Sequence, residues 1–591
     1  MGQPASGLKT GLPVIATHRD DGTIILQSAI DLAPITGTIP GKLAYWAHHK
    51  PDAVFLSDQE RSISYAQAAG EARRISGALL ALAPLIDRPI MILGENSISH
   101  AMVMLGATAI GIPTAIVSPA YVGPAAAPWN KLLRVMDQVD PWLVLADDVE
   151  CAEHALASIE RPILIRPLKD LEWLKQQEPA SSSAIDMAAA RVTPDTVAKL
   201  LFTSGSTGFP KAVTNTQRML VSNMEAIGKV WPFLNQLPPV LVDWLPWNHT
   251  FGGNCCFHIT LWFGGHMHID KGRPTAALMD RSIAALRQYR PTVYFNVPIG
   301  YELLLPVLEK DGEFAKNFFG SVEFLFSAGA PMIASVRTRL EAIGLDMTGR
   351  LPNIVGAWGS TETAPFATVL SFPTAHASNL GVPIPGTAIK LVPEGERYEL
   401  RVRGPNVMPG YWRDEAATAA AFDEEGFYRM GDAGRLADMS DPAAGILFEG
   451  RVAENFKLSS GTFVNVGALR AQIVSGCNGL VSDVVIAGEG HNQLGLLMFL
   501  NEAACLELLN EADSAPFDTH PVLLDRIATL LRQHNMKATG ASFKIARFLI
   551  AAEPPSAAHE EITEKGYINQ RRLLSRRSAL IEQLFDDGHV L

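Results

Sequence analysis

The sequence predicts an α/β protein whose larger, N-terminal part contains parallel-rich sheets covered by helices. The chain has 591 residues, more than one hydrophobic core usually serves, so we expect two or more domains. From about residue 42 to residue 446, segments of helical periodicity alternate with short apolar runs, which is typical of parallel strands joined by helices. The predicted strands are residues 89–93, 114–117, 142–146, 240–244, 292–297 and 322–326.

The pattern changes after Gly381, where strand pairs and turns replace the alternation. Residues 399–403, Glu-Leu-Arg-Val-Arg, alternate with period two, as a half-buried strand does. We therefore expect a small antiparallel or barrel-like subdomain in this part of the chain. The turn-rich segment 440–445 then leads to a predicted domain boundary at Gly450-Arg451.

Beyond the boundary the sequence predicts a compact α+β domain of ordinary size. Residues 483–486 and 494–500 form a predicted hairpin, followed by a helix, a strand near 545–550 and a basic terminal helix. We predict an N-terminal domain of residues 1–450, a mobile C-terminal lid of residues 451–591 and a hinge near 450–454.

The composition of the chain indicates which partners and which cellular compartment to expect. The net charge of −12 and the absence of a basic tract argue against nucleic acid, and Arg571, Arg572, Arg576 and Arg577 are interpreted as a solvated helix face. The five cysteines show neither zinc nor disulfide spacing, which favours the cytoplasm. The apolar stretch 101–117 is broken by two glycines and a proline, so we expect a buried helix and strand rather than a membrane span.

Residues 203–211, Thr-Ser-Gly-Ser-Thr-Gly-Phe-Pro-Lys, suit a polyphosphate such as that of ATP. Glycines allow close approach of the backbone to an anion, hydroxyls donate hydrogen bonds and the lysine adds a positive charge. A buried strand at 199–202 precedes the loop, and Leu220, Met224, Ile227 and Trp231 have the spacing of a helix that leaves it. The alternative is a flexible turn. The predicted phosphate-binding residues are Thr203, Ser204, Gly205, Ser206, Thr207, Gly208 and Lys211.

Other polar residues lie where predicted strands end, which is where ligands bind in α/β folds. Glu362 suits a magnesium ligand beside a phosphate loop, with Thr207 as a second ligand, although a Thr-Glu pair also caps helices. His249 either lines a pocket or is structural, and Asp432 either accepts ribose hydroxyls or belongs to a turn. Lys457 and Lys565, taken singly, have the character of surface lysines.

Taken together in this order, these segments resemble the adenylate-forming superfamily of acyl-CoA synthetases, peptide-synthetase adenylation domains and firefly luciferase. The resemblance covers nearly the whole chain and is greatest to the feruloyl-CoA synthetase branch, through residues 245–253 and 562–571. The matching positions are the loop from Thr203 to Lys211, an adenine-side turn at Gly329-Ala330-Pro331, the stretch containing Trp358, Gly359, Thr361 and Glu362, the turn from Gly381 to Gly386, a ribose aspartate at Asp432 and an interdomain arginine at Arg451.

The resemblance implies an ATP-dependent acid–thiol ligase that uses Mg²⁺ and coenzyme A. The predicted catalytic residues are Lys565, Glu362 and His249, with His249 on the acid side, and Lys457 is predicted among the cofactor-binding residues. The sequence departs from the family pattern at four places, one of which is residues 464–468, where the Pro-x-Glu signature near the start of the small domain is absent. Ala212 replaces a glycine after the loop lysine, Glu454 replaces the hinge aspartate, and Lys565-Gly566 reverses the usual order of the terminal pair.

The expected partners are a small carboxylic acid and coenzyme A, and the sequence leaves a monomer or a homodimer open. By analogy with the feruloyl branch the expected acid is ferulate or another hydroxycinnamate, in a pocket formed by His249, Phe251, residues 297–301 and residues 328–329. Medium-chain fatty acids and benzoates remain alternatives. So do the loading of a carrier protein's phosphopantetheine and a nucleotide-binding homologue without catalysis.

Overall fold

The computed structural model describes residues 11–591 apart from 83–87, 205–209, 276, 330–331, 333, 371, 373, 375, 377, 396, 510–515, 539, 557–558, 560 and 563–567. The chain divides into two compact units. Unit 1 comprises residues 1–392, 401–430 and 436–446, and unit 2 comprises residues 393–400, 431–435 and 447–591. The predicted α/β fold with a small C-terminal domain is confirmed.

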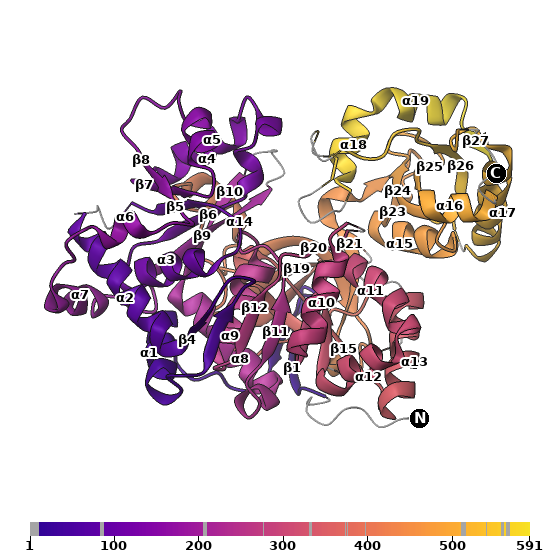
Figure 1. Cartoon of the computed structure of the whole chain (residues 1–591). Coiled ribbons are helices and arrows are strands. Elements are labelled where there is room, and N and C mark those ends of the chain that lie inside the picture. Colours follow the sequence, from indigo (N-terminus) through magenta and orange to yellow (C-terminus); the bar gives the residue numbers. More distant parts are fainter. Residues whose placement is uncertain are drawn as a thin grey trace. The chain divides into compact units, whose positions relative to one another are not determined.

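The first sheet of unit 1 has six strands in the order β10-β9-β6-β5-β7-β8, and only the β10/β9 pair is antiparallel. Strands β5, β6 and β7 are buried along their whole length because helices surround the sheet (Figure 1), which explains their continuous apolar runs. The strands are β5 (Ile90–Leu93), β6 (Thr114–Val117), β7 (Leu143–Ala146), β8 (Leu164–Pro167), β9 (Val197–Ser204) and β10 (Pro210–Thr216).

The helices of this region begin at recognisable caps. The Ser64 side chain and Gln67 form a capping box on α2, and the Ser97 hydroxyl accepts a hydrogen bond from the His100 amide at the start of α3. Residues 101–117 fold as the end of α3 followed by β6, as expected. The helices are α1 (Ile39–His49), α2 (Tyr65–Ala81), α3 (Ile98–Ala109), α4 (Asn130–Val139), α5 (Val149–Ala155), α6 (Glu172–Lys175), α7 (Ser182–Ala189), α8 (Gln217–Val230) and α9 (Phe257–Trp262).

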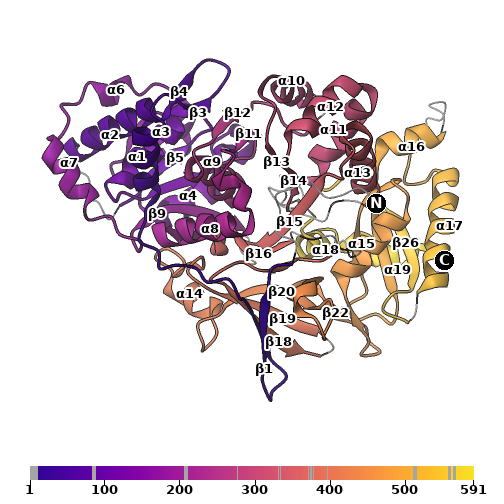
Figure 2. The same cartoon turned by 90° about the horizontal axis from the view of Figure 1, so that it is seen from below.

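Two further sheets complete the α/β part of unit 1. One has the order β11-β12-β3-β4, and the other has the order β13-β14-β15-β16-β17 with parallel pairing from β13 to β15. Helices α10 to α13 gather beside the second sheet (Figure 2). The strands are β3 (Val54–Ser57), β4 (Ser62–Ser64), β11 (Val240–Asp243), β12 (His266–Ile269), β13 (Val293–Asn296), β14 (Phe324–Ser327), β15 (Asn353–Gly359), β16 (Phe366–Leu370) and β17 (Val382–Pro383), and the helices are α10 (Met279–Tyr289), α11 (Pro298–Lys310), α12 (Gly312–Ser321) and α13 (Ala334–Thr348).

The barrel-like subdomain expected after Gly381 is an open sheet in the described residues, with the order β1-β2-β18-β19-β20-β21. The sheet keeps two edges because its terminal strands, β1 and β21, do not pair with each other. The open sheet was not predicted because β1 and β2 come from the start of the chain, far from the residues after Gly381 on which the prediction was based. The strands are β1 (Val14–His18), β2 (Ile24–Ser28), β18 (Ala388–Glu394), β19 (Arg397–Arg403), β20 (Tyr428–Leu436) and β21 (Ile446–Arg451), and helix α14 (Glu415–Ala421) lies between β19 and β20.

A buried ion cluster stabilises this part of unit 1. The carboxylate of Asp423, with no exposed side-chain surface, lies 3.0 Å from Lys390 Nζ and 3.0 Å from Arg401 Nη1. Burial raises the pKa of Asp423, but the Phe427 amide, Lys390 and Arg401 outweigh burial and leave this pKa below its usual value. Glu425 extends the cluster to Arg19 at the surface. The cluster therefore joins β18, β19 and the turn before β20.

We expect Asp423→Asn to lower the free energy of unfolding by about 3 kcal/mol, because two partly buried cations lose their counter-charge. Since the folded-state pKa is depressed, the stabilisation is present above the unfolded pKa and is lost as the pH falls through the folded one. Urea unfolding of the wild type and the variant at neutral and acidic pH measures both effects. Glu425→Gln is the control, expected to cost less than about 1 kcal/mol because its side chain is 39% exposed.

Unit 2 is an α+β domain around a four-stranded sheet in the order β24-β25-β26-β27. The hairpin and the strand expected from the sequence are β24, β25 and β26. Among the described residues of the whole chain, no helix combines the length and apolarity needed to cross a bilayer. The elements are β22 (Phe456–Lys457), β23 (Phe463–Val464), α15 (Val466–Gly476), β24 (Val481–Ala487), β25 (Leu494–Leu500), α16 (Glu502–Leu509), α17 (Pro521–Lys537), β26 (Ile545–Ile550), α18 (Gln570–Arg576), α19 (Ser578–Asp586) and β27 (His589–Val590).

Candidate active site

The predicted phosphate loop connects two paired strands. Strands β9 and β10 are antiparallel, with Thr203 opposite Lys211 and Ser204 opposite Pro210. Gly205, Ser206, Thr207 and Gly208 lie outside the described residues, so the structure places the two ends of the loop. The predicted helix that contains Leu220, Met224 and Ile227 is α8, but a strand that was not predicted separates it from the loop. Strand β10 intervenes because its β-branched and apolar residues are buried beside β9, and α8 starts only after the Thr216 cap.

Glu362 lies beside the end of this hairpin. It occupies a single 3₁₀ turn, Thr361–Thr363, immediately after β15, and is 5% exposed. The Thr203 hydroxyl donates to Glu362 Oε1 over 3.4 Å, and the Tyr411 hydroxyl donates to the same oxygen over 3.1 Å. Unit 1 thus brings a carboxylate to the strand that leads into the hydroxyl-rich loop.

Two tyrosines keep the Glu362 site rich in neutral donors. Burial, followed by the charge of Glu362, raises the pKa of Tyr411, and the same two causes raise the pKa of Tyr428 well above its usual value. Both phenols therefore stay protonated at neutral pH and donate hydrogen bonds. Lys211 Nζ lies 5.1 Å from the centre of the Tyr411 ring, which keeps a positive charge close to this group of oxygens.

The donor set suits a magnesium ion held jointly by protein and substrate. Among the described residues, no carboxylate–cation pair includes Glu362, and no group of three His, Cys, Asp or Glu side chains forms a complete metal site. Mg²⁺ prefers oxygen ligands, and proteins often hold it with one or two carboxylates while phosphates and waters complete its shell. A single buried carboxylate beside hydroxyls fits that requirement. Thr207, the second predicted ligand, lies outside the described residues.

His249 lies in the turn between β11 and a π-helix that spans Phe251–Cys256. The backbone is packed tightly here, since a Cβ on Gly252 would lie 2.3 Å from the Leu245 carbonyl oxygen. The Phe251 ring lies 6.1 Å from Phe295 and 5.6 Å from Phe326, centre to centre, which makes an apolar aromatic wall. π-Helical turns often occur at functional sites.

One residue of the expected acid pocket belongs to the core instead. Tyr301 is fully buried, and its hydroxyl donates to the carbonyl oxygens of Phe326, at 2.8 Å, and Tyr294, at 3.0 Å. Its position on the inner face of α11 directs the ring away from solvent. The expectation failed because the sequence does not show which face of α11 packs on β13 and β14.

The adenine-side segments follow strands β14 and β15. Gly329 has φ +96°, which favours glycine, whereas Ala330 and Pro331 lie outside the described residues. Trp358 and Gly359 end β15, where Trp358 pairs with Thr368 of β16. The segments that contain Gly329 and Trp358 therefore lie at the carboxyl ends of neighbouring strands, where open α/β sheets bind ligands.

In unit 2, Asp432 and Arg451 lie together. Asp432 on β20 is 5% exposed, and its Oδ1 lies 3.1 Å from Arg451 Nε. The pKa of Glu454, the predicted hinge residue, lies above its usual value. Burial is the main cause and Asp432 adds to it, whereas Arg451 and Arg470 act in the opposite direction. Lys457 is exposed on β22.

Lys565 lies outside the described residues, but its flanks are held. The Ile562 and Ile568 backbones pair, and the buried Glu561 carboxylate lies 2.6 Å from Arg577 Nη2. The expectation that Arg577 lies on a solvated face is wrong, because it is 8% exposed and neutralises Glu561. Arg576 Nη1 also donates to Glu561, at 2.8 Å. Arg577 is thus buried against Glu561, whereas Arg576 is exposed and reaches the same carboxylate from the surface, and Arg571 and Arg572 are exposed as expected.

Comparison with known proteins decides the family. A family described as AMP-binding enzyme matches residues 43–412, which is more than half of the chain, and the AMP-binding enzyme C-terminal domain matches residues 455–589. The chain belongs to the AMP-binding enzyme family. The expected adenylate-forming superfamily is therefore confirmed, whereas the feruloyl branch stays an expectation.

The proteins similar to this AMP-binding enzyme carry different names. Atromentin synthetase invA1 of Paxillus involutus is 28% identical over 398 residues, which cover 62% of this chain and 40% of that protein. The structure of O-succinylbenzoate coenzyme A synthetase (MenE) from Bacillus subtilis with AMP has a TM-score of 0.70 at 17% identity, over 91% of this chain and 98% of MenE. Anthranilate CoA ligase AuaEII with anthranoyl-AMP has a TM-score of 0.70 at 16% identity, over 93% of this chain and 99% of the ligase. These structural likenesses show the fold.

Two asparagines that the sequence analysis did not select hold the Glu362 turn. Asn223 Nδ2 on α8 donates to the Thr363 carbonyl oxygen at 3.1 Å, and Asn223 Oδ1 accepts from the Phe366 amide at 2.9 Å. Asn406 Nδ2 donates to the Phe366 carbonyl oxygen at 2.8 Å. The available signal was an asparagine on the apolar face of a helix, because a buried asparagine needs specific partners.

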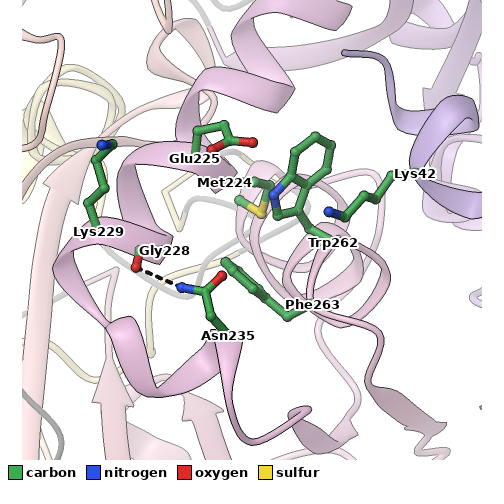
Figure 3. Close-up of a pocket in the computed structure, with 8 residues that line it drawn as sticks. All are labelled: Lys42, Met224, Glu225, Gly228, Lys229, Asn235, Trp262 and Phe263. Carbon is green, nitrogen blue, oxygen red and sulfur yellow. Dashed lines mark hydrogen bonds between the residues drawn. The ribbon is translucent and has the colours of Figure 1, made fainter. Parts of the chain in front are cut away.

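A separate pocket of about 230 Å³ lies against α1, α8 and the end of α9 (Figure 3). The Lys42 ammonium lies 4.7 Å from the centre of the Trp262 ring at its edge, and burial lowers the pKa of this lysine. None of the predicted site residues that the structure describes lines this pocket. Its lining is Lys42, Met224, Glu225, Gly228, Lys229, Asn235, Trp262 and Phe263.

Proposed function

We propose that this AMP-binding enzyme is an ATP-dependent acid–thiol ligase that converts a carboxylic acid to an acyl-AMP and transfers the acyl group to coenzyme A. The observation that supports this most directly is the buried Glu362 carboxylate, which accepts a hydrogen bond from Thr203 where strand β9 enters the 203–211 loop. A carboxylate, hydroxyls and a lysine around a glycine-rich turn match the needs of a magnesium-bound polyphosphate.

A carboxylate is a poor acyl donor because its oxygen is a bad leaving group, so it must first be activated. In the proposed first step, a carboxylate oxygen of the acid bonds to the α-phosphorus of ATP and the α–β phosphoanhydride bond breaks, releasing pyrophosphate. The residues between Thr203 and Lys211 would bind the β- and γ-phosphates. Mg²⁺, when bound near Glu362, would supply charge neutralisation on the phosphate oxygens.

The remaining roles follow the family pattern at matching positions. Asp432 would accept hydrogen bonds from the ribose hydroxyls, and Trp358 would stack on the adenine. Lys565 would bridge the acid carboxylate and the α-phosphate while negative charge builds between them.

In the second step, the thiol of coenzyme A attacks the acyl carbonyl carbon, the bond to AMP breaks and the thiol proton passes to solvent. We propose that residues 451–591 rotate about Glu454 between the two steps, which withdraws Lys565 and admits the thiol.

For the acid, we propose a flat aromatic carboxylate, with ferulate or another hydroxycinnamate as the first candidate. The ring cluster of Phe251, Phe295 and Phe326 supports an aromatic acid. Benzoates and medium-chain fatty acids suit the same apolar wall, so they belong in any test. Loading of a carrier protein is the alternative for the thiol acceptor.

The test is acid-dependent exchange of labelled pyrophosphate into ATP across a panel of hydroxycinnamates, benzoates and fatty acids. We expect exchange with at least one aromatic acid and formation of its thioester when coenzyme A is added. Exchange with fatty acids alone would replace the proposed acid. Exchange without any thioester would favour a carrier protein, and no exchange with any acid would indicate a nucleotide-binding homologue without catalysis.

A further inference from the structure

Lys199 is a buried lysine without a role in the proposed reaction. It lies on β9, four residues before Thr203, and is 2% exposed. Its Nζ donates to the Gly253 carbonyl oxygen over 3.0 Å, and among the described residues no carboxylate lies within 4.0 Å of it. Burial lowers the pKa of Lys199 to about 7. Lysines are rarely buried without an ion pair because desolvation of the ammonium is costly, so this contact requires an explanation.

The partner of Lys199 is a residue that also holds His249. The Gly253 amide donates to the His249 carbonyl oxygen at 2.8 Å, while the Gly253 carbonyl accepts from Lys199. Gly253 tolerates no side chain, because a Cβ there would lie 2.3 Å from the Trp247 carbonyl oxygen. The start of the π-helix is thus clamped between the turn that contains His249 and strand β9.

A second buried contact joins the same π-helix to the other strand of the hairpin. Asn254 Nδ2 donates to Asn215 Oδ1 on β10 over 2.8 Å and to the Thr250 hydroxyl over 3.0 Å. Strands β9 and β10 are the two sides of the hairpin that ends at Thr203 and Lys211. Both sides of the hairpin are therefore connected to residues 249–254 by buried polar contacts.

We propose that Lys199 is a positioning residue that sets the acid-side segment, His249 to Phe251, in register with the phosphate-loop hairpin. This inference rests on the proposed function. It assigns Lys199 to the adenylation step, in which the acid carboxylate must meet the α-phosphorus of ATP. Misplacement by about 1 Å can cost on the order of 10²-fold in rate. Once the acyl-AMP exists, a covalent bond holds the two parts together, so the thiol step no longer depends on this alignment.

The test is Lys199→Met, which keeps the length of the side chain and removes the amine. We expect pyrophosphate exchange with the best acid of the panel to slow by about 10- to 100-fold. The dissociation constant for ATP and the rate of thioester formation from supplied acyl-AMP should change by less than about threefold. The melting temperature should hold or rise, because the variant no longer buries an ammonium. A residue with a merely structural role would lose stability and slow both steps together.

Two variants serve as controls. Lys390→Met removes a buried lysine from the Asp423 ion cluster, so it should lower the melting temperature and leave exchange per folded molecule unchanged. Asn254→Leu breaks the second contact and should reproduce the split between the two steps. Wild-type rates of exchange in Lys199→Met, or equal losses in both steps, would overturn the inference while leaving the proposed function standing. Absence of exchange in the wild type itself would overturn the proposed function instead.

Discussion

We expect Lys565→Ala to slow acyl-adenylate formation by on the order of 10²-fold or more, because it removes the positive charge that, in the proposed reaction, offsets negative charge between the carboxylate and the α-phosphate. Thioester formation from preformed acyl-AMP should stay close to the wild-type rate, since in the proposed cycle the lysine is withdrawn before that step. Exchange of labelled pyrophosphate measures the first step, and thioester formation from synthetic acyl-AMP measures the second.

The matched control for this variant is Lys544→Ala, which removes an exposed lysine of the same unit before β26. It should leave both steps unchanged. If Lys565→Ala slowed both steps equally, the proposal that Lys565 acts only in the adenylation step would be wrong. The same result would remove the reason for rotation of residues 451–591.

Glu362→Gln is expected to slow adenylation by about 10²- to 10³-fold, the range found when one electrostatic contact to a transition state is removed. Glutamine keeps an oxygen that accepts hydrogen bonds from Thr203 and Tyr411, so the change removes the charge and preserves the local packing. We also expect the Mg²⁺ concentration for half-maximal exchange to rise, because the ion loses the charged ligand that we propose for it. Titration of exchange with MgCl₂ at saturating ATP and acid tests both effects.

Glu225→Gln on α8 provides the comparison, because this exposed carboxylate lines the separate pocket of Figure 3, whose lining includes no site residue that the structure describes. It should behave as the wild type. An unchanged magnesium dependence in Glu362→Gln would show that the ion is held elsewhere. The melting temperature of Glu362→Gln should not fall, since the described residues give this carboxylate no cationic partner to lose.

Much of the α/β architecture could be predicted because its strands are short apolar runs bounded by turns. The runs at 114–117 and 143–146 are strands that are buried throughout, and burial on both faces is what makes them continuous in the sequence. The hairpin β9–β10 was not predicted. Its second strand contains Lys211, Thr214 and Asn215, whose polar character concealed a strand that is buried by residues distant in sequence.

The candidate site was predicted in part for a related reason. Glycines, hydroxyls and Glu362 can be recognised in the sequence, because a phosphate and its metal demand those residue types. Tyr411, Asn223 and Asn406 could not be recognised, since each acts through a contact that spans dozens of residues or more of sequence. The role of Lys199 could not be predicted either, because the sequence of an apolar strand does not show which group its lysine ammonium contacts.

The sequence by itself determined the kinds of groups available and the order of the elements that carry them. This information was enough to identify the family, because the family's motifs and the turns that separate its strands are formed by contiguous residues. Only the tertiary structure decided which groups meet: Thr203 with Glu362, Lys199 with Gly253, and Arg577 with Glu561. Each of these contacts depends on burial and chain crossing, which arise when distant segments pack together and which no local pattern of residues encodes.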